Sequence, residues 1–69
     1  MKHHKFSDSS AIASIRHDSK EKILTVSFNS GSSHDFANVP DEIFDAMKVS
    51  DSAGKYFHQN IKGKYNPPD

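Results

Sequence analysis

The residues best suited to bind a ligand gather near the C-terminal end of the sequence. They are basic or aromatic and occupy the stretch 55–65: Lys55, Tyr56, His58, Lys62, Lys64 and Tyr65. Lysines neutralise phosphates and aromatic rings stack on nucleobases, so this combination predicts a surface that binds RNA or another nucleic acid. The same lysines are also typical of an ordinary solvated helix face, and the sequence leaves both interpretations open.

A helix is needed to bring these side chains together. Ala53, Phe57 and Ile61 recur every fourth residue, which predicts the buried stripe of a helix that ends at Gly63. On such a helix the polar residues at i, i+3, i+4 and i+7 share one exposed face: Lys55, His58, Gln59 and Lys62. Gly54 in the first turn weakens the helix by about 1 kcal/mol relative to alanine, so we expect another backbone to pass close to it.

A shorter helix is predicted over residues 40–49. Pro40 suits the first helical position because it has no amide hydrogen, and the acids at 41 and 42 favour the positive end of the helix dipole. Its apolar stripe contains Ile43, Phe44 and Met47, with Ala46 beside it. Residues 50–52 then separate the two helices and supply a serine N-cap for the second, at position 50 or 52.

Upstream of residue 40 the pattern changes to strands. Residues 23–28 alternate strictly, with Leu24, Val26 and Phe28 on one face. Residues 9–17 predict the preceding strand, in which a phase break at Ile12 indicates a bulge or a late start, and residues 32–36 predict the following one. The expected fold is α+β, of order β-β-β-α-α: a three-stranded antiparallel meander with a helical hairpin packed on one face.

The turn at residues 29–31 decides which way the third strand faces. If Asn29, Ser30 and Gly31 form a three-residue loop with a left-handed glycine, Leu24 lies opposite Phe36 and both face the core, together with residue 34. A two-residue loop would turn residues 34 and 36 outward, because a slip of one residue inverts the faces of a strand. We prefer the three-residue loop because it buries Phe36.

Length and composition limit the remaining possibilities. The chain has 69 residues, no cysteine and no net formal charge, which fits one small domain over residues 9–65 between a flexible arm (1–8) and an extended tail (66–69). No apolar run is long enough to span a membrane, and a cytoplasmic location is expected. Overall neutrality argues against a general nucleic-acid binder, although residues 52–65 carry three lysines and no acid.

Catalysis, metals and cofactors are not expected. Ser33, His34 and Asp35 are contiguous, so in a strand their side chains alternate between faces and do not converge as a triad. The histidine pair at residues 3–4 has no further ligands at metal-binding spacing. We interpret His17 and His34 as polar edge histidines, and we predict a protein that is not an enzyme.

Several short segments, in this order and spacing, resemble one known family. They are Ser9-Ser10-Ala11-Ile12, Leu24-Thr25-Val26-Ser27-Phe28, Ser30-Gly31, Val39-Pro40, Ser52-Ala53-Gly54-Lys55-Tyr56-Phe57, Asn60-Ile61 and Tyr65. Together they look like the KTSC domain, over residues 9–65. The family is named for its occurrence at the C-terminus of some lysyl-tRNA synthetases, and it also forms small stand-alone bacterial and phage proteins.

The chain departs from the family at the position of its main signature. The KTSC tyrosine-x-tyrosine of the third strand corresponds here to His34 and Phe36, and His17 stands where an aromatic residue is usual. The resemblance implies RNA binding only through the synthetase context. The alternative is a protein-interaction module or a phage or prophage accessory protein, which would use an open strand edge and the charge-segregated helices for docking.

Overall fold

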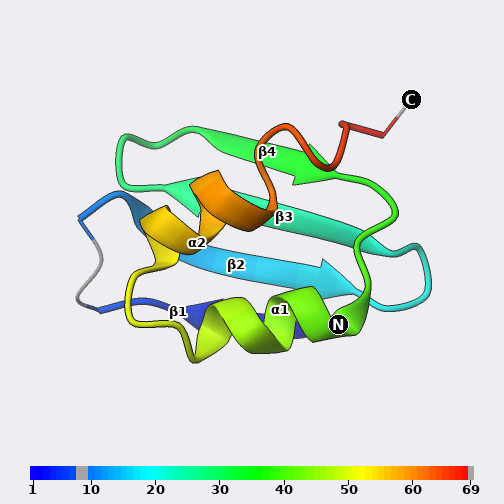
Figure 1. Ribbon diagram of the computed structural model, residues 1–69, viewed down its shortest axis with the longest axis horizontal. Helices are drawn as coiled ribbons and strands as arrows, with labels where there is room; N and C mark the ends of the chain where they lie inside the picture. The colour runs from blue at the N-terminus through cyan, green and yellow to red at the C-terminus, as the bar shows by residue number, and fades with distance from the viewer. Residues whose placement is uncertain (8–9, 69) are drawn as a thin grey trace.

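The computed structural model describes residues 1–7 and 10–68. Within them the elements are β1 (Lys2–Lys5), β2 (Ile12–Asp18), β3 (Ile23–Phe28), β4 (Ser33–Phe36), α1 (Asp41–Lys48) and α2 (Ala53–Asn60). The strands form one antiparallel sheet in the order β1-β2-β3-β4 (Figure 1). The α+β class is confirmed. The three-stranded sheet is wrong, because the sheet has four strands.

The additional strand comes from the segment that the sequence assigned to an arm. β1 pairs antiparallel with β2, and Lys2 lies opposite His17. Its sequence, Lys-His-His-Lys, has no apolar alternation, so its strand conformation depends on the edge of β2 that it pairs with. Asp8 and Ser9, where the arm was expected to end and the domain to begin, lie outside the described residues, as does Asp69.

β2 contains the irregularity that its sequence indicated. Its register with β3 shifts between Ile12 and Ser14. A bulge changes the parity of a strand, and here it lets Ile12 and Ile15 both point toward the helices. Both side chains are buried, which confirms that Ile12 packs in the core despite its apparent phase break.

The β3–β4 connection is the three-residue loop. Gly31 has a φ of 99°, a conformation that glycine adopts without steric cost. The Phe28 amide donates to the Ser32 carbonyl at 2.8 Å, and Leu24 lies opposite Phe36. The predicted register is therefore confirmed, and it places the even-numbered residues of β4 on the same face as the helices.

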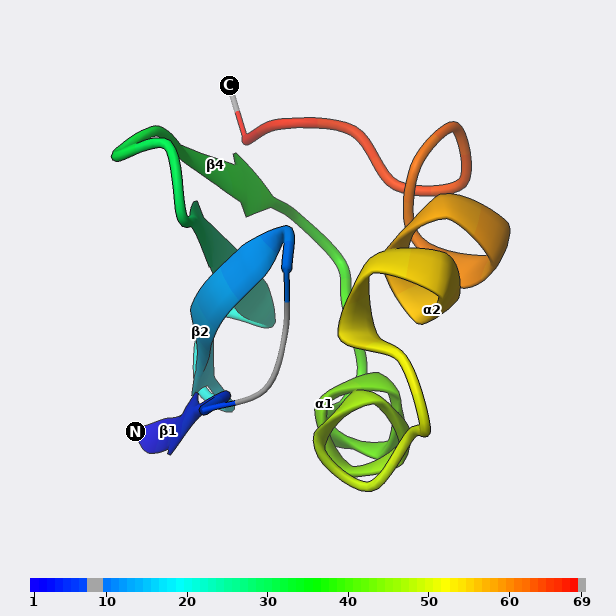
Figure 2. The same cartoon turned by 90° about the vertical axis from the view of Figure 1, so that its left-hand side faces the viewer.

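Both helices cover one face of the sheet, and Figure 2 shows the other face open. α1 begins at Asp41, one residue later than predicted, because Pro40 is its N-cap in an extended conformation. The open face carries polar side chains along β3 and β4. One pair is bonded there, with the Thr25 hydroxyl donating to Asp35 at 2.7 Å.

The core lies between the helices and the covered sheet face. Its buried apolar residues are Ile12, Ile15, Leu24, Val26, Val39, Phe44, Met47, Ala53, Phe57 and Ile61. Phe44 and Met47 of the predicted α1 stripe are buried, whereas Ala46 is exposed. Over the described residues, neither helix has the length and apolarity that crossing a membrane requires.

Candidate functional site

The predicted polar stripe lies on the exposed side of α2. The helix begins after Ser52, whose hydroxyl oxygen accepts from the Lys55 amide at 3.3 Å, and it buries Ala53 and Phe57 against the core. The stripe on the opposite side is exposed at each position: Lys55, His58, Gln59 and Lys62. Burial of the apolar stripe therefore fixes the direction in which these side chains project.

The basic exit from α2 is held in a hydrogen-bonded turn. α2 ends at Asn60, three residues before the predicted end, because the regular i to i−4 pattern stops there: the Phe57 carbonyl accepts from the Ile61 amide at 3.0 Å and also from the Lys62 amide at 2.9 Å. The Lys64 amide then donates to the Ile61 carbonyl at 3.0 Å. Lys62 and Lys64 are both exposed, so the two ammonium groups extend from a fixed backbone.

The tail after this turn returns to the end of β4. The Ala37 amide donates to the Asn66 carbonyl at 2.8 Å, and Figure 1 shows the C-terminal segment beside β4. A hollow of about 420 Å³ lies at this junction, and Lys64 and Tyr65 are among the residues that line it.

The two tyrosines are less available than the sequence suggested. Both are partly buried and pack against the core cluster. Burial raises the pKa of Tyr56, and the nearby Tyr65 raises this pKa further. Packing therefore covers part of each ring and leaves the rest of its surface accessible.

A groove between β4 and α2 brings two of the predicted site residues to a group of aromatic rings. His58 and Lys62 line it together with residues from β3, β4 and the buried side of α2, and its volume is about 360 Å³. The other lining residues are Phe28, His34, Phe36 and Phe57. We call this feature the aromatic groove. Lys55, Tyr56, Lys64 and Tyr65 do not line it.

The rings of the aromatic groove are arranged around Phe57. The centroid of Phe57 lies 5.5 Å from that of Phe28 and 5.6 Å from that of Phe36, with interplanar angles of 85° and 66°. His58 and His34 extend the cluster, at 5.7 Å from Phe57 and 5.6 Å from Phe28 respectively. These are favourable edge-to-face contacts, so the rings form one connected cluster.

Sequence reasoning had part of the information needed to find this groove. The register prediction placed His34 and Phe36 on the helix-facing side of β4, and the KTSC signature drew attention to the same two positions. The sequence did not indicate that α2 would pass close enough to β4 for His58 and Lys62 to join them. That proximity depends on how the helix packs across the sheet.

The charges around the two helices are separated. No acidic residue lines the aromatic groove, and over the described residues Lys55, Lys62 and Lys64 form no ion pair. Two acids of α1 are engaged elsewhere: Lys2 donates to Asp45 at 3.2 Å and lies 3.6 Å from Asp41. The Asp45 hydrogen bond is the main reason that the pKa of Lys2 is raised.

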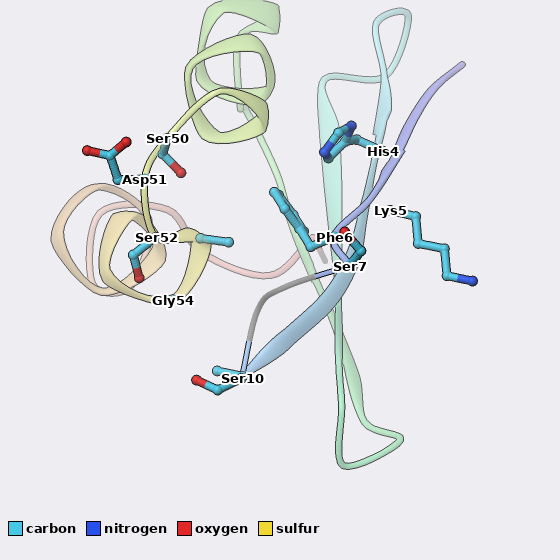
Figure 3. Close-up of a pocket in the computed structure, with 11 residues that line it drawn as sticks. His4, Lys5, Phe6, Ser7, Ser10, Ser50, Asp51, Ser52 and Gly54 are labelled. Atoms are coloured by element: carbon cyan, nitrogen blue, oxygen red, sulfur yellow. The ribbon is translucent and has the colours of Figure 1, made fainter.

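A third hollow, of about 390 Å³, lies where the chain leaves β1 and passes the connection between the two helices. Figure 3 shows Phe6 directed toward this connection, whereas the Lys5 side chain points away from the helices. Serines and Asp51 provide most of its polar lining. None of the predicted binding residues contributes to it.

His17 is buried, and its interpretation as a polar edge histidine is wrong. Its exposed fraction is 0%, because its side chain lies on the helix-covered face of the sheet against Val39 and Phe44. The pairing of β1 with β2 also makes β2 an interior strand. The Nε2 atom lies 2.6 Å from the Val39 carbonyl, so Nε2 carries a hydrogen and donates it. His34, by contrast, is exposed on the edge strand β4, as predicted.

The other ring nitrogen of His17 faces a carboxylate. Nδ1 lies 3.3 Å from Oδ1 of Asp41, the first residue of α1. The Ser19 hydroxyl donates to Asp41 at 3.0 Å. This bond is the largest cause of the lowered pKa of Asp41; desolvation opposes it, and the electrostatic interactions of Asp41 with Lys2, His17 and Lys22 add to it. The Ser19 bond links the start of α1 to the β2–β3 connection, whereas the approach of Nδ1 to Oδ1 does not have the geometry of a hydrogen bond.

The contiguous Ser-His-Asp sequence does not form a triad. Asp35 accepts from Thr25 on the open face of the sheet, whereas His34 lines the aromatic groove on the other face. Among the described residues, no three histidine or acidic side chains are grouped as a metal site would need.

The fold and the groove define a small α+β domain with a basic, aromatic surface at one end, and comparison with known proteins places it in a family. The KTSC domain model matches residues 8–65. The chain belongs to the KTSC domain family. A crystal structure of a KTSC domain protein from Yersinia pestis superimposes with a TM-score of 0.88 at 26% identity, covering 99% of this chain and 94% of that one.

Relatives of two kinds share this domain. The chain is 36% identical over 58 residues to a lysine–tRNA ligase of Trichormus variabilis, covering 84% of this chain but only 10% of the ligase. It is 35% identical over 57 residues to an uncharacterised protein of Stutzerimonas stutzeri, covering 83% of this chain and 80% of that protein. The domain therefore occurs both as a small part of a large enzyme and as most of a small protein.

Proposed function

We propose that this KTSC domain is a non-enzymatic module that binds nucleic acid, with RNA as the leading partner. The observation that carries the proposal is the aromatic groove, where a cluster of aromatic rings lies directly beside His58 and Lys62. Proteins that bind single-stranded nucleic acid without sequence preference combine such rings with a basic surface that follows the phosphate backbone. A solvated helix face would need no such neighbouring rings.

The basic surface extends on both sides of the groove. Lys55 lies on the exposed side of α2, and Lys62 and Lys64 lie in the turn that follows the helix. Each is exposed and without an acidic partner among the described residues, so binding a phosphate would not require breaking an ion pair. We assign these three lysines to phosphate contacts.

The relatives support RNA among the nucleic acids. The lysine–tRNA ligases that carry a similar domain act, as their name states, on a transfer RNA. A domain that holds RNA would be useful to such an enzyme. This chain spans about a tenth of those ligases, so only the binding role is proposed here and not their activity.

The test is a titration of a fluorescent transfer RNA pool and a mixed-sequence single strand with the purified protein at several salt concentrations. Three phosphate contacts predict a slope of about −2 to −3 in a plot of log affinity against log salt. No change in anisotropy at low salt and high protein concentration would refute the proposal. Capture of a protein without nucleic acid from the native host would favour the interaction module instead.

A further inference from the structure

We propose that the aromatic groove holds one unpaired nucleobase, so that the target of this domain is single-stranded. The inference rests on the proposed function and makes it more specific, because phosphate contacts alone do not distinguish a strand from a duplex. It assigns binding roles to Phe36 and His34, which the sequence treated as core-facing and edge residues. Tyr56 and Tyr65 do not line the groove and take no part in this base contact.

The floor of the groove is suited to a flat aromatic ligand. Phe57 is 7% exposed, and its ring contacts the rings of Phe28 and Phe36 edge-to-face. Both of these rings are only partly buried. Because they meet Phe57 edge-to-face rather than in a stack, another planar ring can lie against their remaining surface. Every nucleobase has such a planar face, so stacking here requires no particular sequence.

The rim of the groove is suited to the polar parts of a nucleotide. His34, opposite Val26 on the edge strand, and His58 on α2 are exposed on two sides of the same groove. Their ring nitrogens can donate to or accept from the edge of a base. Lys62 completes the rim, and its ammonium group can contact the phosphate attached to the bound nucleotide.

A duplex does not fit this arrangement. Paired bases are stacked on one another and present only their edges in the grooves. A base can reach the rings of the aromatic groove only after it has left the stack. A single strand presents its bases without that requirement, while its phosphates remain available to Lys55 and Lys64.

The test compares three fluorescent probes of equal length by anisotropy at low salt: a mixed-sequence RNA strand, the corresponding RNA duplex, and an abasic strand that keeps the sugar–phosphate backbone. The key variant is Phe36→Leu, which keeps an apolar side chain but removes the planar ring. Phe6→Leu is the matched control, because Phe6 is also partly buried against the core but lines the hollow beside the α1–α2 connection. Circular dichroism and thermal unfolding verify that both variants are folded.

We expect the complete strand to bind more tightly than the duplex or the abasic strand. Phe36→Leu should weaken binding of the complete strand by about 5- to 150-fold, the equivalent of one lost base stack, and leave binding of the abasic strand unchanged. Phe6→Leu should bind all three probes like the original protein. RNA should also shift the amide resonances of His34 and His58 in an NMR titration.

Two results would overturn the inference in distinguishable ways. If the abasic strand binds as tightly as the complete strand, or if Phe36→Leu and Phe6→Leu bind alike, no base occupies the groove, yet nucleic-acid binding stands. If none of the probes binds, the proposed function itself fails. A preference for the duplex would also contradict the inference. It would indicate that the protein binds through phosphate contacts alone.

Discussion

His17 Nδ1 lies 3.3 Å from Asp41 Oδ1, and this contact joins an interior strand to the first residue of a helix. The histidine is buried, and its other nitrogen donates to the Val39 carbonyl. A single imidazole therefore contacts the segment before α1 and the start of α1. The position of this helix on the sheet depends on a polar group that the sequence alone placed at an edge.

Replacing His17 should destabilise the domain more than replacing an exposed polar residue would. His17→Phe conserves most of the ring volume but leaves the Val39 carbonyl buried without its donor, at a cost of about 1–3 kcal/mol. Chemical denaturation followed by circular dichroism measures the change. His34→Phe, at an exposed position on the edge strand, is the control and should change the free energy of unfolding by less than about 0.5 kcal/mol. Equal effects of the two substitutions would contradict the role of the buried contact.

The lowered pKa of Asp41 predicts how stability changes in acid. A carboxyl group whose pKa is lower in the folded state than in the unfolded state stabilises the fold at any pH above its unfolded pKa, which is ordinarily 3.8. This contribution is lost as the pH falls through the folded pKa. The free energy of unfolding should therefore decrease as the pH falls below about 4. The decrease should be less steep in Asp41→Asn. Parallel pH profiles for the two proteins would show that Asp41 carries no such linkage.

Two glycine substitutions should have opposite effects. A Cβ atom built on Gly54 would lie 3.5 Å from the Ala11 Cβ, an ordinary contact, so the close backbone approach that the sequence suggested is not what requires glycine here. Gly54→Ala should stabilise α2 by up to about 1 kcal/mol. Gly31→Ala meets no neighbour but has a φ of 99°, and it should destabilise the turn by about 1–2 kcal/mol. Thermal unfolding of both variants tests the contrast.

Removing residues 1–5 tests whether β1 belongs to the fold. The truncation deletes the strand that pairs with β2 and the Lys2 contacts to Asp41 and Asp45. It should lower the melting temperature by more than about 4 °C, which corresponds to about 1 kcal/mol in a domain of this size. Lys2→Ala alone is the comparison and should have a smaller effect, since exposed ion pairs contribute little. An unchanged melting temperature would mean that this segment does not support the sheet.

Removing single lysines should separate phosphate contacts from general charge. Lys62→Ala should reduce RNA affinity and make the salt slope shallower by about 1. Lys20→Ala removes the same charge at an exposed position of the β2–β3 connection, far along the chain from α2, and should leave the slope unchanged. If both variants lose the same affinity, binding follows net charge rather than the surface of α2.

The predictable part of the structure follows from local chemistry. Strict alternation in residues 23–28, the left-handed glycine of the following turn and the apolar stripe of α2 each depend on near neighbours in the chain. They were sufficient to predict three strands, both helices and the pairing of Leu24 with Phe36. The resemblance to the KTSC family, confirmed over residues 8–65, rests on the same segments.

The features that the sequence missed depend on residues distant in the chain. The segment Lys-His-His-Lys has no strand pattern, and it became β1 because the edge of β2 was available for pairing. Once β1 was in place, His17 belonged to an interior strand. Of the predicted binding residues, His58 and Lys62 reached the aromatic groove only because α2 packs beside β4.

The sequence by itself determined the type of every element except β1, the register of β3 with β4 and the exposed face of α2 that carries Lys55, because hydrogen bonding and side-chain periodicity act locally. Only the tertiary structure decided the fourth strand, the burial of His17 against Asp41 and the union of His34 and Phe36 with His58 and Lys62. These contacts form between segments that have no local reason to meet. The packing of apolar stripes brings them together.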